Sequence, residues 1–249
     1  MKRVIIYGDI HGCLDELILL REKIDIKEDD IEISVGDFLS KGPYSIQTLR
    51  FLQKNGILCV RGNHEDRYIR YKIHFEEEKR SGKKNPMKVD EDFKKVFFSL
   101  KRSDFDFLNS LKFFIKIDRL TVVHGGVTNR IFLDRATKED FAKVMRLRFV
   151  DENQDFVSLD EVDKKGCCYW SEIYDGHEGF IVYGHQPFLK PKIDRFSIGI
   201  DTGAVYGNYL SAVVFDMDEE VIIPSFRFYF QKSKKAYALR APLTIIYIS

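Results

Sequence analysis

The sequence predicts an α/β fold in which a parallel β-sheet is flanked by helices. Short runs of β-branched and aromatic residues alternate with helical patterns over the first sixty residues. Strands are expected at 4–7, 31–35 and 57–60, with helices between them. This order is typical of a parallel sheet with helices on its faces. The second half has strand-like runs without helices between them, so mainly antiparallel strands are expected there.

Helical signals support the elements between these strands. Leu14 and Leu17 recur at helical spacing, and a second helical pattern over 43–54 ends at an Asn-Gly pair. Residues 65–112 are expected to be helical, apart from a polar run at 80–86 that we interpret as a surface loop.

The remaining chain is expected to complete one domain. Further strands are predicted at 120–123, 181–183, 198–200, 210–215 and 221–223. The polar, acidic segment 151–165 is expected to lie outside the core. We predict a single domain over 1–230 and a C-terminal tail over 231–249 whose role the sequence leaves open. The apolar run 243–248 in this tail has strand character and could pair with a sheet edge or with a partner.

Composition excludes several classes of protein. The 249 residues are 44% hydrophobic and 32% charged, which suits a globular domain with a sizeable core. The net charge of +1 gives no electrostatic reason to expect binding to nucleic acid or to an anionic membrane. No apolar run is long enough to cross a bilayer, so we expect a cytoplasmic protein. The four cysteines show neither C-x-x-C spacing nor a disulfide framework and are expected to be reduced thiols.

Five of the expected strands end in glycine beside a residue that can bind a metal ion. The segments are GDIHG at 8–12, GD at 36–37, GNHE at 62–65, HGG at 124–126 and GHQP at 184–187. Ligands of open α/β sheets bind outside the carboxyl ends of the strands, and glycine lets the backbone turn sharply there. Four of the six histidines lie in these segments. Seven side chains are therefore expected to meet at one edge: Asp9, His11, Asp37, Asn63, His64, His124 and His185.

These residue types point to a particular chemistry. Carboxylate, amide oxygen and imidazole together suit divalent ions such as manganese, iron or zinc. Two such ions, typically about 3.5–4 Å apart, clamp a phosphoryl group and make hydroxide available near neutral pH. Asp9 or Asp37 alone could instead cap a helix. In combination with His11 and Asn63, the two aspartates favour a phosphate-splitting metal centre.

The ordered motifs GDIHG, GDFLSKG, GNHE, HGG and GHQP resemble those of the calcineurin-like metallophosphoesterases. More narrowly, they resemble the phosphoprotein phosphatase superfamily. Its small bacterial members, among them symmetrical diadenosine tetraphosphate hydrolases and related serine/threonine phosphatases, are similar in GDIHGCLDEL, YGHQPFLKPK and GIDTGAVYGNYLSAVVF. The resemblance runs from about residue 3 to about residue 216. It implies a metallophosphoesterase-type sandwich of two mixed β-sheets flanked by helices.

The resemblance also implies roles for the motif residues. The metal ligands would be Asp9, His11, Asp37, Asn63, His124 and His185. Asp37 would bridge two divalent ions, for which we expect Mn²⁺, with iron, zinc, nickel or cobalt as alternatives. His64 would be catalytic, as the general acid for the leaving oxygen. The substrate phosphate would be bound by Lys41 and by a further arginine. Arg146 and Arg148 are the candidates for it, although they could also form a solvated face.

One motif departs from the family pattern GDxxDRG. Ser40 stands where the family has an aspartate that hydrogen-bonds the catalytic histidine, and Lys41 stands where it has an arginine. Lysine keeps the charge but lacks the bidentate fork of arginine. Symmetrical diadenosine tetraphosphate hydrolases also lack this aspartate. Ser40 therefore disfavours a conventional protein phosphatase.

The predicted activity is metal-dependent hydrolysis of phosphoanhydride or phosphomonoester bonds. A symmetrical bis(5'-nucleosyl)-tetraphosphatase-like hydrolase is the preferred reading. The alternatives are a serine/threonine protein phosphatase, an RNA-end phosphatase and a non-catalytic metal-binding regulator. The expected partner is a phosphorylated small molecule or nucleotide, with a phosphoprotein as the alternative, and not a membrane. The sequence does not predict the oligomeric state.

Overall fold

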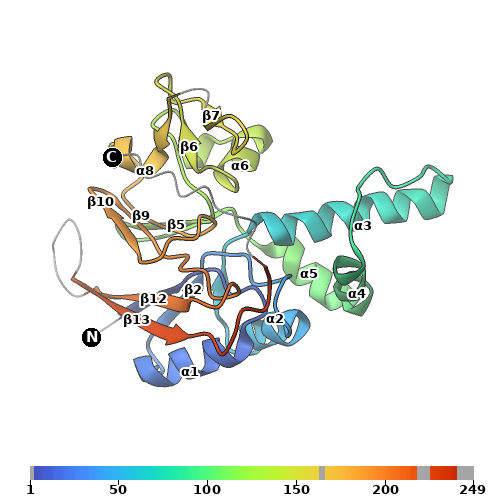
Figure 1. Ribbon diagram of the computed structural model, residues 1–249, viewed down its shortest axis with the longest axis horizontal. Helices are drawn as coiled ribbons and strands as arrows, with labels where there is room; N and C mark the ends of the chain where they lie inside the picture. Colours follow the sequence, from blue (N-terminus) through green and yellow to red (C-terminus); the bar gives the residue numbers. More distant parts are fainter. Residues whose placement is uncertain (1–2, 163–165, 218–224, 240–249) are drawn as a thin grey trace.

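Two five-stranded sheets form the centre of the molecule (Figure 1). The computed structural model describes residues 3–162, 166–217 and 225–239. In spatial order, the first sheet consists of β13 (Phe226–Lys232), β12 (Tyr209–Asp216), β1 (Arg3–Tyr7), β2 (Ile31–Ser34) and β3 (Leu58–Cys59). The second consists of β10 (Lys192–Asp194), β11 (Ser197–Gly199), β9 (Phe180–Tyr183), β5 (Leu120–Val123) and β4 (Phe114–Ile117). The predicted sandwich of two mixed sheets is confirmed.

Strand direction follows the connections. β1, β2 and β3 are parallel and are joined by α1 (Leu14–Ile24) and α2 (Ser45–Lys54), as predicted. β12 and β13 add to this sheet in antiparallel orientation. In the second sheet, β4 and β10 are antiparallel to their neighbours, but β5, β9 and β11 are parallel. The prediction of antiparallel strands is therefore wrong for the three middle strands of the second sheet. Parallel pairing of β5 with β9 is possible because the long segment 124–179 forms the crossover between them.

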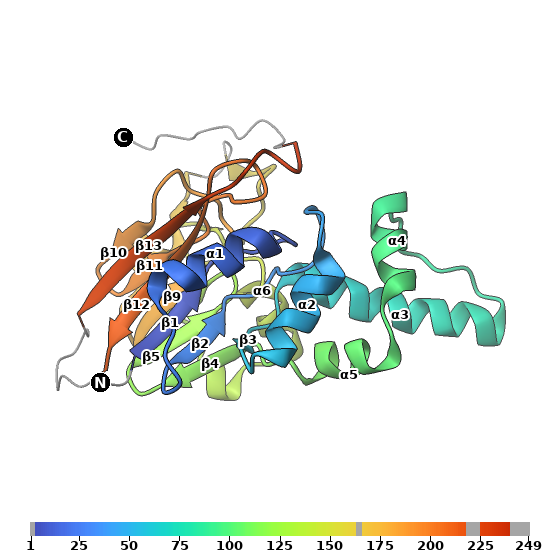
Figure 2. The ribbon, with the colours of Figure 1, turned by 90° about the horizontal axis from the view of Figure 1, so that it is seen from below.

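The layers follow from alternation of side chains along each strand. Ile5 and Tyr7 of β1 pack toward α1, whereas Val4 and Ile6 belong to the core between the two sheets. α1 lies on β12 and β13, and together with α2 it covers the outer face of the first sheet (Figure 2). Apolar residues on both faces of β1 explain why its sequence reads as an uninterrupted apolar run.

Three helices project to one side of the sheets as an arm (Figures 1 and 2). They are α3 (Asn63–Ser81), α4 (Glu91–Ser99) and α5 (Arg102–Ser110). α3 ends where Gly82 adopts a left-handed conformation with φ of 74°, so the predicted break at 80–86 is confirmed. Stacking of Tyr68 on Phe93, with centroids 4.1 Å apart, joins α3 to α4. The helix starts earlier than predicted and includes Asn63 and His64 in its first turn.

A third, small sheet lies over the outer face of the second sheet (Figure 1). It comprises β7 (Phe156–Val157), β6 (Phe149–Val150) and β8 (Cys168–Tyr169), and it is accompanied by the 3₁₀ helix η1 (Leu133–Arg135), α6 (Lys138–Val144) and α8 (Trp170–Ile173). Trp170 is buried in this layer and donates to the Gly125 carbonyl at 3.1 Å. This contact places the segment after β5 against the small sheet.

The C-terminal part of the described chain packs onto α1. The Lys234 amide and the Tyr237 hydroxyl both donate to Glu16 Oε1, at 3.2 and 2.9 Å. The sequence did not reveal β4, β10 or β13, while the predicted strand 221–223 and the apolar run 243–248 lie outside the described residues. Among the described residues, no helix has the length and apolar character needed to cross a membrane.

Candidate metal centre

A cavity of about 220 Å³ opens at the carboxyl ends of the parallel strands. It lies where the five glycine-bounded motifs meet. Its lining residues are His11, Asp37, Lys41, Asn63, His64, Arg148, Leu159, His185, Gln186, Pro187, Asp201 and Tyr206. Most of the predicted site residues therefore share one cavity.

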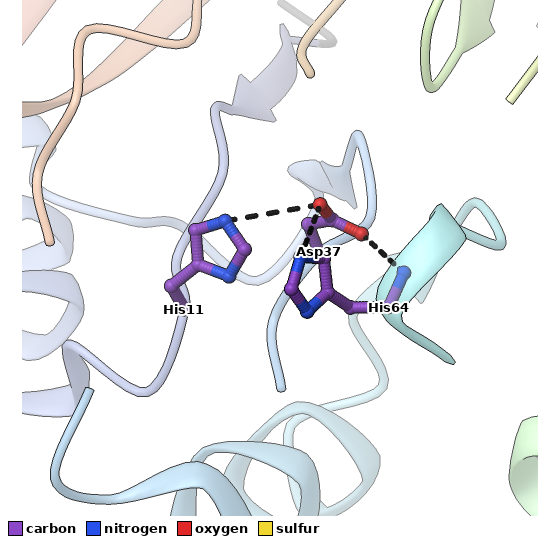
Figure 3. A group of neighbouring side chains, drawn as sticks. All are labelled: His11, Asp37 and His64. Atoms are coloured by element: carbon purple, nitrogen blue, oxygen red, sulfur yellow. Dashed lines mark hydrogen bonds and ion pairs between the residues drawn. The ribbon is translucent and has the colours of Figure 1, made fainter. Parts of the chain in front are cut away.

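Asp37, just after β2, is the centre of this cluster. Its Oδ2 lies 3.7 Å from His11 Nε2, 3.8 Å from His64 Nε2 and 3.3 Å from His124 Nε2. Its Oδ1 accepts a hydrogen bond of 2.9 Å from the His64 amide. Figure 3 shows the carboxylate between the His11 and His64 side chains. A carboxylate with imidazole nitrogens on several sides is suited to being shared by two cations.

Backbone carbonyls orient two of the imidazoles. His11 Nδ1 donates to the Leu39 carbonyl at 3.0 Å, and His124 Nδ1 donates to the Val35 carbonyl at 2.9 Å. With the proton on Nδ1, the Nε2 atom of each neutral ring presents its lone pair toward the Asp37 carboxylate. This arrangement is typical of histidines that bind metal ions.

The donor atoms fit two metal ions. His185 Nε2 is buried and has no hydrogen-bond partner among the described residues. His124 Nε2 lies 3.0 Å from Asn63 Oδ1, so two ligand atoms converge there. The ligand atoms within each of two groups lie within 4.8 Å of one another: His11, Asp37 and His64 in one, and Asp37, His124 and His185 in the other. A buried, unpaired imidazole nitrogen is costly, and a bound cation would satisfy it.

Asp9 joins the first motif to the last. Both of its carboxylate oxygens accept from the His185 amide, at 3.0 and 3.2 Å, across 176 positions of sequence. Gly184 makes this approach feasible, because a Cβ at that position would lie 2.1 Å from Asp9 Oδ1 and 2.5 Å from Val35 Cγ2. The glycine before His185 is thus required by the closeness of the Asp9 carboxylate.

The imidazoles of the site differ in their protonation. Although burial opposes charge on His124, the Asp37, Asp9 and Glu65 carboxylates outweigh it and raise the pKa of His124 to about 9, so a metal ion would have to displace its Nε2 proton. Burial lowers the pKa of His64 to about 4 and holds the pKa of His185 well below its usual range, so both rings are neutral near pH 7. Burial opposes charge on Asp37, but His124 and His64 outweigh it and hold the pKa of that carboxyl well below its usual range. Burial raises the pKa of Asp9 well above its usual range. Carboxylates buried this close together are stabilised by nearby cations.

Unusual backbone conformations cluster at the same place. Eight non-glycine residues among the described ones have positive φ, and five of them belong to this site. The five are His11, Asp37, Ser40, Lys41 and His185. Such conformations are unfavourable for residues with a Cβ and persist where the surrounding structure enforces them, commonly at functional sites.

The three predicted substrate-binding residues do not lie together. Lys41 Nζ is 2.9 Å from His11 Nε2 and 5.2 Å from the centroid of the Tyr206 ring, so it faces the cavity. Arg148 also lines the cavity, and its Nη2 donates to the His185 carbonyl at 3.4 Å. Arg146 lines a different hollow and donates to the Ala142 carbonyl at 3.0 Å. The structure therefore brings only one of the two candidate arginines to the cavity.

Sequence reasoning missed a residue that holds two motifs together. Glu65 is fully buried, and its Oε2 accepts from the amides of Asp37 and Gly62 at 2.8 and 3.1 Å. Its Oε1 accepts from the Leu39 amide at 3.0 Å. An acidic residue three positions after a helix start is a recognisable capping signal. Asp201, which lines the cavity, had no comparable signal.

Comparison with known proteins decides the family. A family model described as calcineurin-like phosphoesterase matches residues 2–212. The chain belongs to this family. Calcineurin-like phosphoesterases are hydrolases with a centre of two divalent metal ions, in agreement with the two ligand groups around Asp37.

The matches to curated relatives of this calcineurin-like phosphoesterase extend over nearly the whole length of those relatives. A Bacillus subtilis protein named bis(5'-nucleosyl)-tetraphosphatase PrpE [asymmetrical] is 29% identical, over 88% of this chain and 93% of that protein. The Bacillus velezensis protein of the same name is 28% identical, over 88% and 92% of the two chains.

Solved structures show the same fold. A crystal structure of a putative diadenosine tetraphosphatase superposes with a TM-score of 0.72 at 24% identity, covering 92% of this chain and 93% of that one. A Saccharomyces cerevisiae serine/threonine phosphatase with similarity to human PP5 gives a TM-score of 0.57 at 15% identity, covering 96% and 81%. At these identities the superpositions support the fold of the calcineurin-like phosphoesterases and not a substrate.

Proposed function

We propose that this chain hydrolyses a phosphoanhydride bond of dinucleoside tetraphosphates with two bound divalent ions, preferably Mn²⁺. The arrangement of imidazoles around Asp37 carries the metal-dependent part of this proposal. The names of the curated relatives support the substrate class. Those names specify asymmetrical cleavage, so we propose it in place of the symmetrical cleavage implied by the motif resemblance.

The ions would be held by six residues. These are Asp9, His11, Asp37, Asn63, His124 and His185. When bound, the ions would provide Lewis-acid stabilisation of the phosphoryl oxygens and activate water. Asp37 orients the cluster through its contacts with three histidines, and the carbonyls of Leu39 and Val35 fix two of the rings.

The other polar side chains would act on the substrate. Lys41 and Arg148 place positive charge in the cavity, where it would stabilise charge that develops on the phosphoryl group. His64 lines the same cavity and is the candidate donor of a proton to the leaving oxygen; because burial lowers its pKa to about 4, only a small protonated fraction is present near pH 7. Its Nδ1 is buried and has no hydrogen-bond partner among the described residues, while Ser40 Oγ pairs with the Tyr68 hydroxyl at 3.0 Å.

His64 Nδ1 thus has no carboxylate partner among the described residues, and this favours anhydrides over phosphoserine as substrates. A phosphoserine alkoxide is a poor leaving group and depends on proton donation from a well-oriented acid. A nucleotide phosphate leaves from an anhydride with less need for that proton. The environment of His64 therefore supports the nucleotide substrate over the protein phosphatase alternative.

The test is product analysis with purified protein. Diadenosine tetraphosphate, a phosphoserine peptide and an aryl phosphate are each incubated with Mn²⁺, and nucleotides are separated by ion exchange. We expect ATP and AMP from the dinucleotide, whereas two ADP would establish symmetrical cleavage. Asp37→Asn should lose activity and bound metal, and Asp106→Asn, on the exposed face of α5, serves as the matched control. Turnover of the phosphopeptide without turnover of the dinucleotide would overturn the proposal.

A further inference from the structure

A second hollow lies outside the candidate metal centre. Its volume is about 670 Å³, and it lies between the first turns of α3 and the region of α6. Its lining residues are Arg61, Asp66, Arg70, Phe113, Lys138, Ala142, Met145 and Arg146. We call it the basic hollow.

The lining carries an excess of positive charge. Four cationic side chains face a single carboxylate, that of Asp66. Asp66 Oδ2 accepts from Arg70 Nε at 2.8 Å and lies 3.6 Å from Arg146 Nη2, so one anion is shared by two guanidinium groups. Lys138 is exposed, so its ammonium is accessible to a ligand. Four cations and one carboxylate leave a net charge of +3 in the hollow, which attracts a multivalent anion.

Not every nitrogen of the Arg61 guanidinium has a hydrogen-bond partner among the described residues. Its Nη2 donates to the Asn109 carbonyl at 2.9 Å, which fixes the side chain against α5. Its Nε is buried without a hydrogen-bond partner in the described parts of the chain. Because Nε is shielded, the Nη end of the guanidinium is the part that would meet a phosphate oxygen in the hollow.

The aromatic ring in the hollow is not free to stack on a base. The Arg61 guanidinium carbon lies 4.8 Å from the centroid of the Phe113 ring. The Phe141 ring stacks on Phe113 at 4.4 Å and 11°. One face of a ring cannot hold both groups, so both faces of Phe113 are covered. A ligand would therefore be recognised by its phosphates and not by stacking of a base.

The same two chain segments, α3 and 146–148, contribute residues to both the basic hollow and the metal-centre cavity. His64 lines the metal-centre cavity, whereas Asp66 and Arg70 of the same helix line the hollow. Likewise Arg148 lines the cavity and Arg146 the hollow. An anion in the hollow would be held by residues close in sequence to those of the cavity, without contacting the proposed metal ligands.

We propose that the basic hollow is a second binding site for an oligophosphate chain. The chain could come from the far end of a dinucleoside polyphosphate whose other end is in the metal centre, or from a free oligophosphate. Both sources present consecutive phosphates to Arg61, Arg70, Lys138 and Arg146. Binding at the hollow does not depend on the reaction proposed for the metal centre.

The experiment measures binding of inorganic tripolyphosphate by calorimetry to chelator-treated protein. Arg70→Gln/Lys138→Gln removes two exposed cations of the hollow and is expected to weaken binding about a hundredfold, since each of the two charged contacts is worth about tenfold. Lys83→Gln/Lys95→Gln removes two exposed, ion-paired cations elsewhere and should leave the affinity unchanged. Binding at the metal centre is common to all three proteins and cancels in the comparison. Equal affinities in the two double variants would overturn the proposal.

Two further measurements complete the test. Arg61→Lys keeps the positive charge but lacks the planar guanidinium, so it should weaken tripolyphosphate binding. The melting temperature of the variant is measured in parallel to detect a loss of stability. Unchanged affinity would count against the proposal. The source of the phosphates follows from the ratio of KM for diadenosine tetraphosphate to KM for an aryl phosphate. A higher ratio in Arg70→Gln/Lys138→Gln than in the control identifies the far end of the substrate, and an equal ratio with weakened binding identifies a free oligophosphate.

Discussion

Gly184→Ala tests whether the close contact between the GHQP segment and Asp9 builds the metal centre. The added Cβ would lie 2.1 Å from Asp9 Oδ1 and 2.5 Å from Val35 Cγ2, and both neighbours are buried. Relief of the clash requires the Asp9 carboxylate to move, which breaks its contacts with the His185 amide at 3.0 and 3.2 Å. The change thus acts on two proposed ligands through one methyl group.

The magnitude follows from three contributions. Overpacking of a close-packed interior costs about 1–3 kcal/mol. Leaving the buried His185 amide without its acceptor costs about 1–3 kcal/mol. The lower entropy of the unfolded alanine chain offsets about 0.4–1 kcal/mol. We expect the free energy of unfolding to fall by about 2–5 kcal/mol.

Urea unfolding and elemental analysis provide the assays. Bound metal should fall below that of the unaltered protein, because displaced Asp9 no longer presents its carboxylate beside His185. Gly56→Ala is the control, since a Cβ there meets nothing within 4 Å and its φ of 66° brings only local backbone strain. The reasoning is refuted if Gly184→Ala retains full metal content and unfolds within about 0.5 kcal/mol of the unaltered protein.

Three further predictions concern the metal ions, Ser40 and acid stability. Chelation should abolish hydrolysis of diadenosine tetraphosphate and Mn²⁺ should restore it best; full activity after exhaustive chelation would contradict the metal-dependent mechanism. Ser40→Asp should raise kcat/KM for a phosphoserine peptide more than for the dinucleotide, because a carboxylate could then orient His64, and an unchanged ratio would count against this role. Burial opposes charge on Asp30, but Arg3, whose Nε donates to it at 2.9 Å, outweighs burial and holds the pKa of Asp30 below its usual value. The resulting stability is present above about pH 4 and is lost as the pH falls through the folded-state pKa, so Asp30→Asn should flatten the fall in urea stability between about pH 5 and pH 2; an equally steep fall would show that another group is responsible.

Sequence patterns that span only a few residues predicted the first strands and helices of the chain. β1, α1, β2 and α2 appear close to their predicted positions because alternation, helical spacing and glycine stops act over a few residues. β13 has mixed exposure along its length and lies at an edge of the first sheet, so its sequence lacks a clean alternation. The parallel pairing of β5 with β9 was not predicted because it depends on the path of the intervening segment 124–179.

The sequence by itself determined which residue types gather at the metal centre. Each motif combines a strand end, a glycine and a ligand within a few positions, and the carboxyl ends of parallel strands meet at one edge whatever else the chain does. Only the tertiary structure decided which face each neighbouring side chain takes. Arg146 and Arg148 are two positions apart, but one lines the basic hollow and the other lines the cavity of the metal centre. Glu65 and Gly184 acquire their roles from partners 28 and 175 positions away, and such contacts arise from the packing of whole elements, which no local pattern encodes.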